Sequence, residues 1–88
     1  MLPCTIVIIN WNSWDLLAQC LEALTLQTFK KFKVIIADNS ETNYVPPHIL
    51  QTPLELVVIK NENNFGFAKG NNRVINKYVD TDWVICLN

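Results

Sequence analysis

The sequence contains few of the residues that usually mark a metal-binding or catalytic site. Its 88 residues include one histidine and three cysteines. Cys4, Cys20 and Cys86 lie inside apolar runs without metal-ligand spacing, so we expect each to be a small buried hydrophobic residue. His48 follows two prolines, and we expect it on an exposed loop rather than in catalysis. A serine, histidine and aspartate pattern for nucleophilic catalysis is also missing, so the sequence predicts no catalytic residue.

Positive charge and long hydrophobic runs are scarce as well. Only 17% of the residues are charged and the formal net charge is −1, whereas a nucleic-acid-binding surface needs a basic stripe. We therefore expect no nucleic-acid partner, and we interpret Lys30, Lys31 and Lys33 as a solvated loop before a strand. No apolar run approaches the roughly 18 residues of a membrane span. Without a signal peptide, and with an odd number of cysteines, the chain is expected to be cytoplasmic.

Glycine is limited to Gly66 and Gly70. This excludes the dinucleotide-binding G-x-G-x-x-G pattern after the first strand, and no P-loop sequence is present. Both glycines lie in the polar segment 64–72, where they allow a ligand to approach the main chain closely. We expect a helix to begin near Gly66 to Ala68, with Phe67, Asn71, Val74, Ile75 and Tyr78 on one face.

Apolar runs predict an α/β fold with a mostly parallel sheet. Residues 4–9, 34–37, 54–59 and 83–87 are rich in β-branched and other apolar side chains, which is typical of strands buried in a sheet. A helix is expected between the first two strands and should end at Gln27-Thr28. Its apolar stripe consists of Leu16, Leu17, Cys20, Leu21 and Leu24. At most a short helical turn is expected over 48–51.

Each predicted strand ends in polar residues. These are Asn10, Asp38-Asn39-Ser40, Lys60-Asn61 and Asn88, and in a parallel sheet they meet at one edge, where ligands of α/β proteins bind. A row of amides with one carboxylate suits a ligand with many polar groups, such as a nucleoside. Asp38-Asn39-Ser40 is also compatible with a simple turn. Asp80 and Asp82 precede the last strand, so we expect them at the opposite edge and not in a metal site.

Four segments together resemble the family 2 glycosyltransferases, with the rhamnosyltransferase-like branch nearest. They are Ile8-Ile9-Asn10-Trp11-Asn12, the helix with Cys20-Leu21-Glu22-Ala23-Leu24 and Gln27, Val34-Ile35-Ile36-Ala37-Asp38-Asn39-Ser40, and Asn64-Phe65-Gly66-Phe67-Ala68-Lys69-Gly70-Asn71-Asn72. The resemblance covers nearly the whole chain in order. Trp11 stands where that branch often has tyrosine, which keeps an aromatic ring there.

The resemblance implies a GT-A fold, a Rossmann-like nucleotide-diphospho-sugar transferase half-domain. Its mostly parallel sheet should have strand order 3-2-1-4 and helices on both faces. Asn10 and Asn12 would lie beside the nucleoside, Asp38 with its neighbour Asn39 would contact the base or ribose, and the wall around it would be formed by Asn64, Gly66, Gly70 and Asn71. The donor would be a UDP- or dTDP-sugar, and the acceptor a glycan or a lipid-linked glycan.

The resemblance also implies that residues 1–88 are a truncated N-terminal part of an inverting enzyme. The divalent metal (Mg²⁺ or Mn²⁺) would be held by a motif after the fourth strand, beyond Asn88, and the catalytic base lies further on. We therefore expect no turnover from this chain, possible attachment of the whole enzyme to a membrane surface, and self-association through Trp83 and Leu87. The alternative function is a non-catalytic nucleotide-binding or interaction module of the same fold. A receiver-type signalling domain would need an acidic cluster after the first strand, where Asn10-Trp11-Asn12 has none.

Overall fold

A computed structural model of the chain describes residues 3–29, 31–40, 44–60 and 66–87, with the backbone alone for 66–71. The strands form one parallel sheet of order β3-β2-β1-β4. The predicted α/β class and strand order are thereby confirmed. In chain order the elements are β1 (Cys4–Asn10), α1 (Trp14–Thr25), β2 (Phe32–Asp38), α2 (Pro47–Leu50), β3 (Leu56–Lys60), α3 (Gly66–Tyr78) and β4 (Trp83–Leu87).

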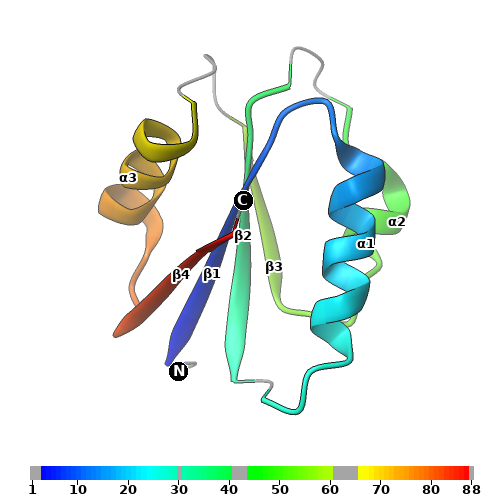
Figure 1. The fold of residues 1–88 in the computed structure, drawn as a ribbon, viewed down its shortest axis with the longest axis horizontal. Helices are drawn as coiled ribbons and strands as arrows, with labels where there is room; N and C mark the ends of the chain where they lie inside the picture. The colour runs from blue at the N-terminus through cyan, green and yellow to red at the C-terminus, as the bar shows by residue number, and fades with distance from the viewer. Residues whose placement is uncertain (1–2, 30, 41–43, 61–65, 88) are drawn as a thin grey trace.

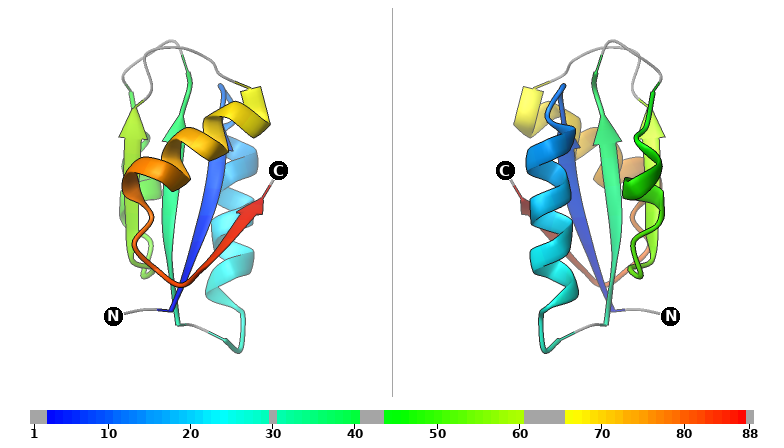
Figure 2. Two further views of the ribbon diagram at one scale, coloured as in Figure 1. Left: turned by 90° about the vertical axis from the view of Figure 1, so that its left-hand side faces the viewer. Right: turned by 90° about the vertical axis from the view of Figure 1, so that its right-hand side faces the viewer.

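Helices cover both faces of the sheet, as expected. Figure 1 shows α3 on one side of the strands and α1 with α2 on the other. The two views of Figure 2 show α3 crossing in front of the strands on one face and α1 running along β1 on the opposite face. Since all strands are parallel, their carboxyl ends meet at the edge from which the chain enters α1.

The two central strands hold the core because they are covered on both faces. In β2 every residue except Lys33 is buried, and in β1 every residue except Ile9. Side chains alternate between the faces of a strand. On the side of α1 the buried cluster consists of Cys4, Ile6, Ile8, Leu17, Leu21, Phe32, Val34, Ile36 and Ile49. On the side of α3 the cluster is smaller and consists of Val7, Ile35, Ala37 and Val74.

The apolar stripe of α1 is only partly buried. Leu17 and Leu21 are buried in the core, but Leu16 is 68% exposed. Leu16 lies in the first turn of the helix and lines an open pocket beside the end of β1. Including Leu16 in the buried stripe was therefore wrong. The helix also ends at Thr25, two residues before the predicted end.

The outer elements differ in detail from the predictions. The short helix α2 begins one residue earlier than expected, and it contains the exposed His48. The strand β3 starts two residues later than expected and includes Lys60. In α3, Val74 is buried but Tyr78 is exposed, so Tyr78 does not share the buried face. The side chains of Phe67 and Asn71 lie outside the described residues.

The edge strand β4 carries the most exposed apolar side chains of the sheet. It pairs only with β1 within the described sheet, and Trp83 is 72% exposed. Cys86 is half-buried, as is Cys20 in α1, so only Cys4 is a fully buried cysteine as predicted. Self-association through this edge stays a prediction. Among the helices that the structure describes, none combines the length and apolar content needed to cross a bilayer.

At the amino end of the sheet, Lys33 of β2 forms an ion pair with Asp80, which precedes β4. The interpretation of Lys33 as part of a solvated loop was therefore wrong, because β2 begins one residue before it and Asp80 binds its ammonium group. Asp80 lies at the edge opposite Asp38, as the order of the elements predicts.

Candidate functional site

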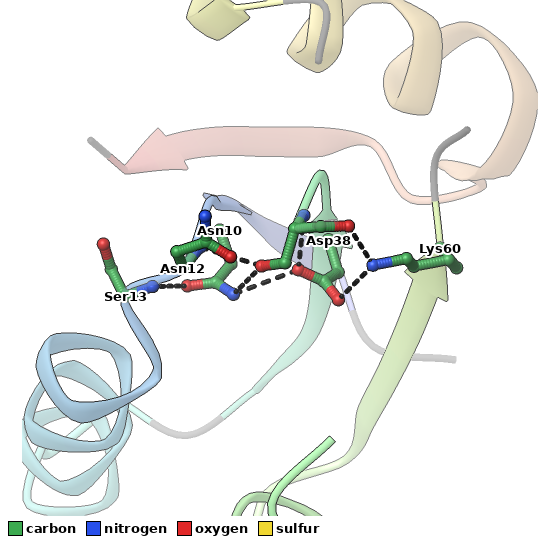
Figure 3. Close-up of polar contacts among 6 residues, drawn as sticks. Asn10, Asn12, Ser13, Asp38 and Lys60 are labelled. Atoms are coloured by element: carbon green, nitrogen blue, oxygen red, sulfur yellow. Dashed lines mark hydrogen bonds and ion pairs between the residues drawn. The ribbon is translucent and has the colours of Figure 1, made fainter. Parts of the chain in front are cut away.

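Three polar residues stand side by side at the carboxyl edge of the sheet. The strand registers pair Asn10 of β1 with Asp38 of β2, and Asp38 with Lys60 of β3. Figure 3 shows the three side chains in one row, connected by hydrogen bonds and an ion pair. Parallel pairing thus brings together side chains that are far apart in the sequence.

The carboxylate of Asp38 is the centre of this group. Its Oδ1 accepts hydrogen bonds from the Asn10 amide nitrogen (3.0 Å) and from the backbone N–H of Ser40 (3.1 Å). Its Oδ2 forms an ion pair with Nζ of Lys60 at 3.2 Å. The side chain of Asp38 is fully buried, so this charge depends on its donors for stabilisation.

These donors also control the ionisation of the carboxyl group. Burial by itself raises the pKa of Asp38, because it disfavours the charged form. Hydrogen bonds from the hydroxyl and N–H of Ser40, from Asn10 and from Lys60 outweigh burial, and the pKa of Asp38 is lowered from its ordinary value. Asp38 is therefore an ionised, acceptor-only group at neutral pH.

Ser40 connects Asp38 to the turn after β1. Its Oγ accepts hydrogen bonds from the Asn10 amide nitrogen (3.2 Å) and from the backbone N–H of Asn12 (2.8 Å). Its carbonyl oxygen accepts a hydrogen bond from Lys60. Ser40 is itself buried, so the segment after β2 has a defined place in the site and is more than a surface turn.

The turn between β1 and α1 is shaped by Asn12. Its φ angle is +53°, in the left-handed region that asparagine tolerates better than most residues. This conformation directs the Asn12 N–H toward Ser40, while the Asn12 side chain is exposed at the rim of the site. Ser13 occupies the N-cap position of α1 without a side-chain cap bond. Instead, the Ser13 N–H donates to Oδ1 of Asn10 at 3.3 Å.

The other predicted site residues are placed less completely. Asn39 is buried beside the group, and its N–H donates to the Asn10 carbonyl oxygen at 2.7 Å. Gly66, Gly70 and Asn71 belong to the backbone of α3, with Gly66 as its first residue. Asn64 lies outside the described residues, as do Asn61 and Asn88. The structure therefore brings Asn10, Asn12, Asp38 and Asn39 together, and the role of the segment 64–71 stays a prediction.

Two members of the group, Ser40 and Lys60, were not among the predicted site residues. Ser40 was expected at the polar edge as part of Asp38-Asn39-Ser40, but no role in the site was assigned to it. Lys60 was predicted to follow the third strand, whereas it is the last residue of β3 and is in register with Asp38. The signal that could have identified Lys60 is its position directly after an apolar run, opposite a carboxylate on the neighbouring strand.

An open pocket of about 330 Å³ adjoins the group on the face of α1. Asn10 and Ser13 form its polar part, and its other lining residues are Ile8, Ile9, Trp11, Leu16, Leu17, Cys20 and Leu87. A pocket with an apolar wall and a few polar groups at its end has the composition of a small-molecule site. Asn10 belongs to both the pocket and the polar group.

A divalent metal has no evident set of ligands in this part of the chain. Within the described residues there is no group of three or more His, Cys, Asp or Glu side chains that could hold a metal ion. The carboxylate of Asp38 is already bound by an ammonium group and by neutral donors. The residues present therefore do not fit a metal centre.

The chain matches the sequence model of glycosyl transferase family 2 over residues 5–88. Among solved structures, its fold is similar to that of the mannosyltransferase PcManGT from Pyrobaculum calidifontis, determined in complex with GDP-Man and Mn²⁺. The TM-score is 0.71 at 18% sequence identity. The similarity covers 88% of this chain and 24% of that enzyme, so the chain spans about a quarter of the enzyme's length. No curated protein sequence matches the chain. The match over almost the entire sequence shows that this chain belongs to glycosyl transferase family 2.

Proposed function

We propose that residues 1–88 form the N-terminal, donor-binding part of an inverting glycosyltransferase that uses a nucleoside-diphosphate sugar. Family membership supports a sugar-transferring enzyme. The observation that carries the proposal is the buried carboxylate of Asp38, held ionised at the carboxyl edge of a parallel sheet beside the Asn10 amide. This edge is where α/β folds of this kind bind nucleotides.

In this proposal the polar group recognises the nucleoside. Asp38 accepts a hydrogen bond from a base N–H or a ribose hydroxyl, since an ionised carboxylate is an acceptor only. Asn10 and Ser40 keep the carboxylate in position through their hydrogen bonds. Asn12 and Asn39 lie beside the nucleoside, and Asn64, Gly66, Gly70 and Asn71 shape the wall around it.

The reaction of the whole enzyme is a direct displacement. The acceptor hydroxyl oxygen forms a bond to the anomeric carbon while the bond from that carbon to the diphosphate breaks, and a carboxylate takes the hydroxyl proton. In the whole enzyme, a bound Mg²⁺ or Mn²⁺ would supply positive charge near the diphosphate. We propose that its ligands and the base lie outside residues 1–88, so that this chain alone has no turnover.

The finer assignments follow from the resemblance and are part of the same proposal. The branch is rhamnosyltransferase-like, the donor is a UDP- or dTDP-sugar, and a hexosyl group passes to a glycan or lipid-linked acceptor in the cytoplasm during polysaccharide synthesis. The similar mannosyltransferase was determined with GDP-Man, so GDP belongs in any test of the donor base.

Calorimetry on the 88-residue chain tests the proposal. UDP, dTDP and GDP are titrated with and without Mn²⁺ into the wild type, Asp38→Asn and Asp80→Asn. Asp38→Asn preserves the shape of the side chain, and Asp80→Asn removes the same charge at the opposite edge. We expect metal-independent binding of one nucleotide, weakened in Asp38→Asn and retained in Asp80→Asn. Equal binding in all three proteins, or no binding to the folded wild type, would contradict the proposal.

A further inference from the structure

The two oxygens of the Asp38 carboxylate have donors of different kinds. Oδ1 is bound by the Asn10 amide and the Ser40 N–H, and both of these hydrogen bonds are buried. The Asn10 amide is fixed in turn, because its nitrogen also donates to the Ser40 hydroxyl oxygen and its oxygen accepts from Ser13. These donors belong to a rigid frame that a ligand cannot replace without disrupting the turn.

Oδ2 is bound by Lys60, whose side chain is 33% exposed. The ammonium group also donates to the Ser40 carbonyl oxygen, so it covers two acceptors at once. It reaches them from the end of β3, on the side of Asp38 away from Asn10 (Figure 3). A lysine side chain is long and flexible, and its ammonium group is strongly hydrated. Moving it into water is therefore easier than moving any of the donors to Oδ1.

Asp38 is fully buried while this contact is present. A nucleoside that binds to the carboxylate must therefore replace one of the donors already there. We infer that Lys60 is a displaceable counter-ion, which occupies Oδ2 of Asp38 until a donor group of the nucleotide takes its place. This inference rests on the proposed function, because it presupposes that Asp38 binds the nucleoside.

The exchange selects for the chemistry of the incoming group. An ionised carboxylate and a carbonyl oxygen are both acceptors, so the ligand must bring an N–H or O–H to the place of the ammonium group. Uracil, thymine and guanine have a ring N–H, whereas the corresponding ring nitrogen of cytosine is an acceptor. The ribose hydroxyls are the other source of a donor, and they are common to UDP, GDP and CDP.

The test follows the Lys60 side chain during binding. The 88-residue chain is labelled with ¹³C at the lysine ε-carbon and titrated with UDP, dTDP, GDP and CDP, with the amide signals of Asn10 and Asp38 as reporters of binding. We expect UDP or GDP to shift the Lys60 ε signal toward that of a solvated lysine, with the Lys33 signal unchanged. Displacement by CDP as well would show that the donor is not the ring N–H but a ribose hydroxyl or, for CDP, the exocyclic amino group of cytosine. Binding that leaves the Lys60 signal unchanged would overturn the inference.

The Lys60→Met variant measures the competition directly. It removes the charge but keeps an unbranched side chain of similar length, and its effect on the diphosphate is common to all the nucleotides. If the base displaces Lys60, the ratio of the affinity for UDP or GDP to the affinity for CDP should rise about two- to fivefold in Lys60→Met. This is the fold-change that corresponds to the energy of a partly exposed ion pair. A falling preference would show that Lys60 itself holds the base, against the inference. If neither protein binds any nucleotide, the proposed function fails and the inference fails with it.

Discussion

Two lysine–aspartate pairs lie at opposite ends of the same sheet. At the carboxyl end Asp38 pairs with Lys60, and at the amino end Asp80 pairs with Lys33. The residue types are identical, but the side chain of Asp38 is fully buried and that of Asp80 is 64% exposed. The pKa of Asp38 is lowered by hydrogen bonds from Ser40, Asn10 and Lys60, which outweigh its burial. The pKa of Asp80 is lowered mainly by the hydrogen bond and the charge of Lys33.

The comparison shows that the surroundings of an ion pair decide what it does. In an exposed pair such as Asp80–Lys33, each charged group gives up bound water for its partner, so the pair contributes little to stability. A buried carboxylate such as Asp38 must be surrounded by donors, and these donors hold several segments of the chain in one arrangement. The donors at the carboxyl end therefore hold the ends of β1, β2 and β3 together, while the pair at the amino end only joins β2 to the segment before β4.

The largest difference is expected when each carboxylate is removed. Asp38→Ala removes the acceptor of the Ser40 N–H and one acceptor each of the Asn10 amide and the Lys60 ammonium, and each buried donor left unsatisfied costs about 1–3 kcal/mol. Asp80→Ala should have a far smaller effect. Urea denaturation of both variants measures the free energies of unfolding. Equal losses would contradict the comparison, and Asp38→Asn shows how much of the loss is due to charge.

Protonation of Asp38 in acid should change the free energy of unfolding less than Asp38→Ala does. A protonated carboxyl group still fills the space of the side chain. The pKa of Asp38 is lowered from 3.8, so its ionised form stabilises the fold above this value. That contribution is lost as the pH falls through 3.8 to the lower pKa of the folded state. The difference in unfolding free energy between the wild type and Asp38→Asn should therefore shrink below about pH 4.

Salt provides the control for the acid experiment. The pKa of Asp80 is also lowered, so the difference in unfolding free energy between the wild type and Asp80→Asn should depend on pH with the same sign. In 1 M NaCl, where the screening length is about 3 Å, the exposed pair loses its effect and the buried pair keeps most of it. If the pH dependence of the difference between the wild type and Asp38→Asn disappears in salt, Asp38 is accessible to solvent.

The hydroxyl groups at the two ends extend the comparison. Ser40→Ala removes the oxygen that accepts from Asn10 and Asn12, and unsatisfied buried donors of this kind cost about 1–3 kcal/mol. At the amino end, Thr81 shares a hydrogen bond with Thr5 at 2.6 Å and donates to the Trp83 carbonyl. Thr81 is only half-buried, so Thr81→Ala should destabilise the fold less. Thermal unfolding of both variants tests this order, and the reverse order would contradict it.

Much of the fold could be predicted because apolar runs mark buried strands directly. Val34 to Ala37 is buried throughout, as an uninterrupted apolar run predicts. The polar residues after these runs then had to meet at one edge, which identified Asn10 and Asp38. The strand order 3-2-1-4 came from the family resemblance, since the spacing of strands along the chain leaves their order open.

The rest depended on registers and packing that a local pattern does not contain. Lys60 was expected at the polar edge, but its ion pair with Asp38 was not predicted, because the register that places the two residues side by side is not contained in the sequence of either strand. Leu16 has the helical spacing of its buried neighbours but lines an open pocket at the end of β1. Ser13 occupies the N-cap position of α1 without a side-chain cap bond, and its own N–H donates to Oδ1 of Asn10, a contact that depends on the turn geometry.

The smallest effects are expected at Asn12, which holds the turn beside Ser40 in a left-handed conformation with φ of +53°. Alanine in this conformation costs about 1–2 kcal/mol, whereas glycine adopts it without a steric penalty. Asn12→Ala should therefore be less stable than Asn12→Gly in thermal unfolding. Both variants lack the asparagine side chain, so their difference isolates the backbone. If Asn12→Gly is stable but binds nucleotide less well, the exposed amide itself contacts the ligand. If its binding is normal, Asn12 serves the site through the N–H that it directs to Ser40.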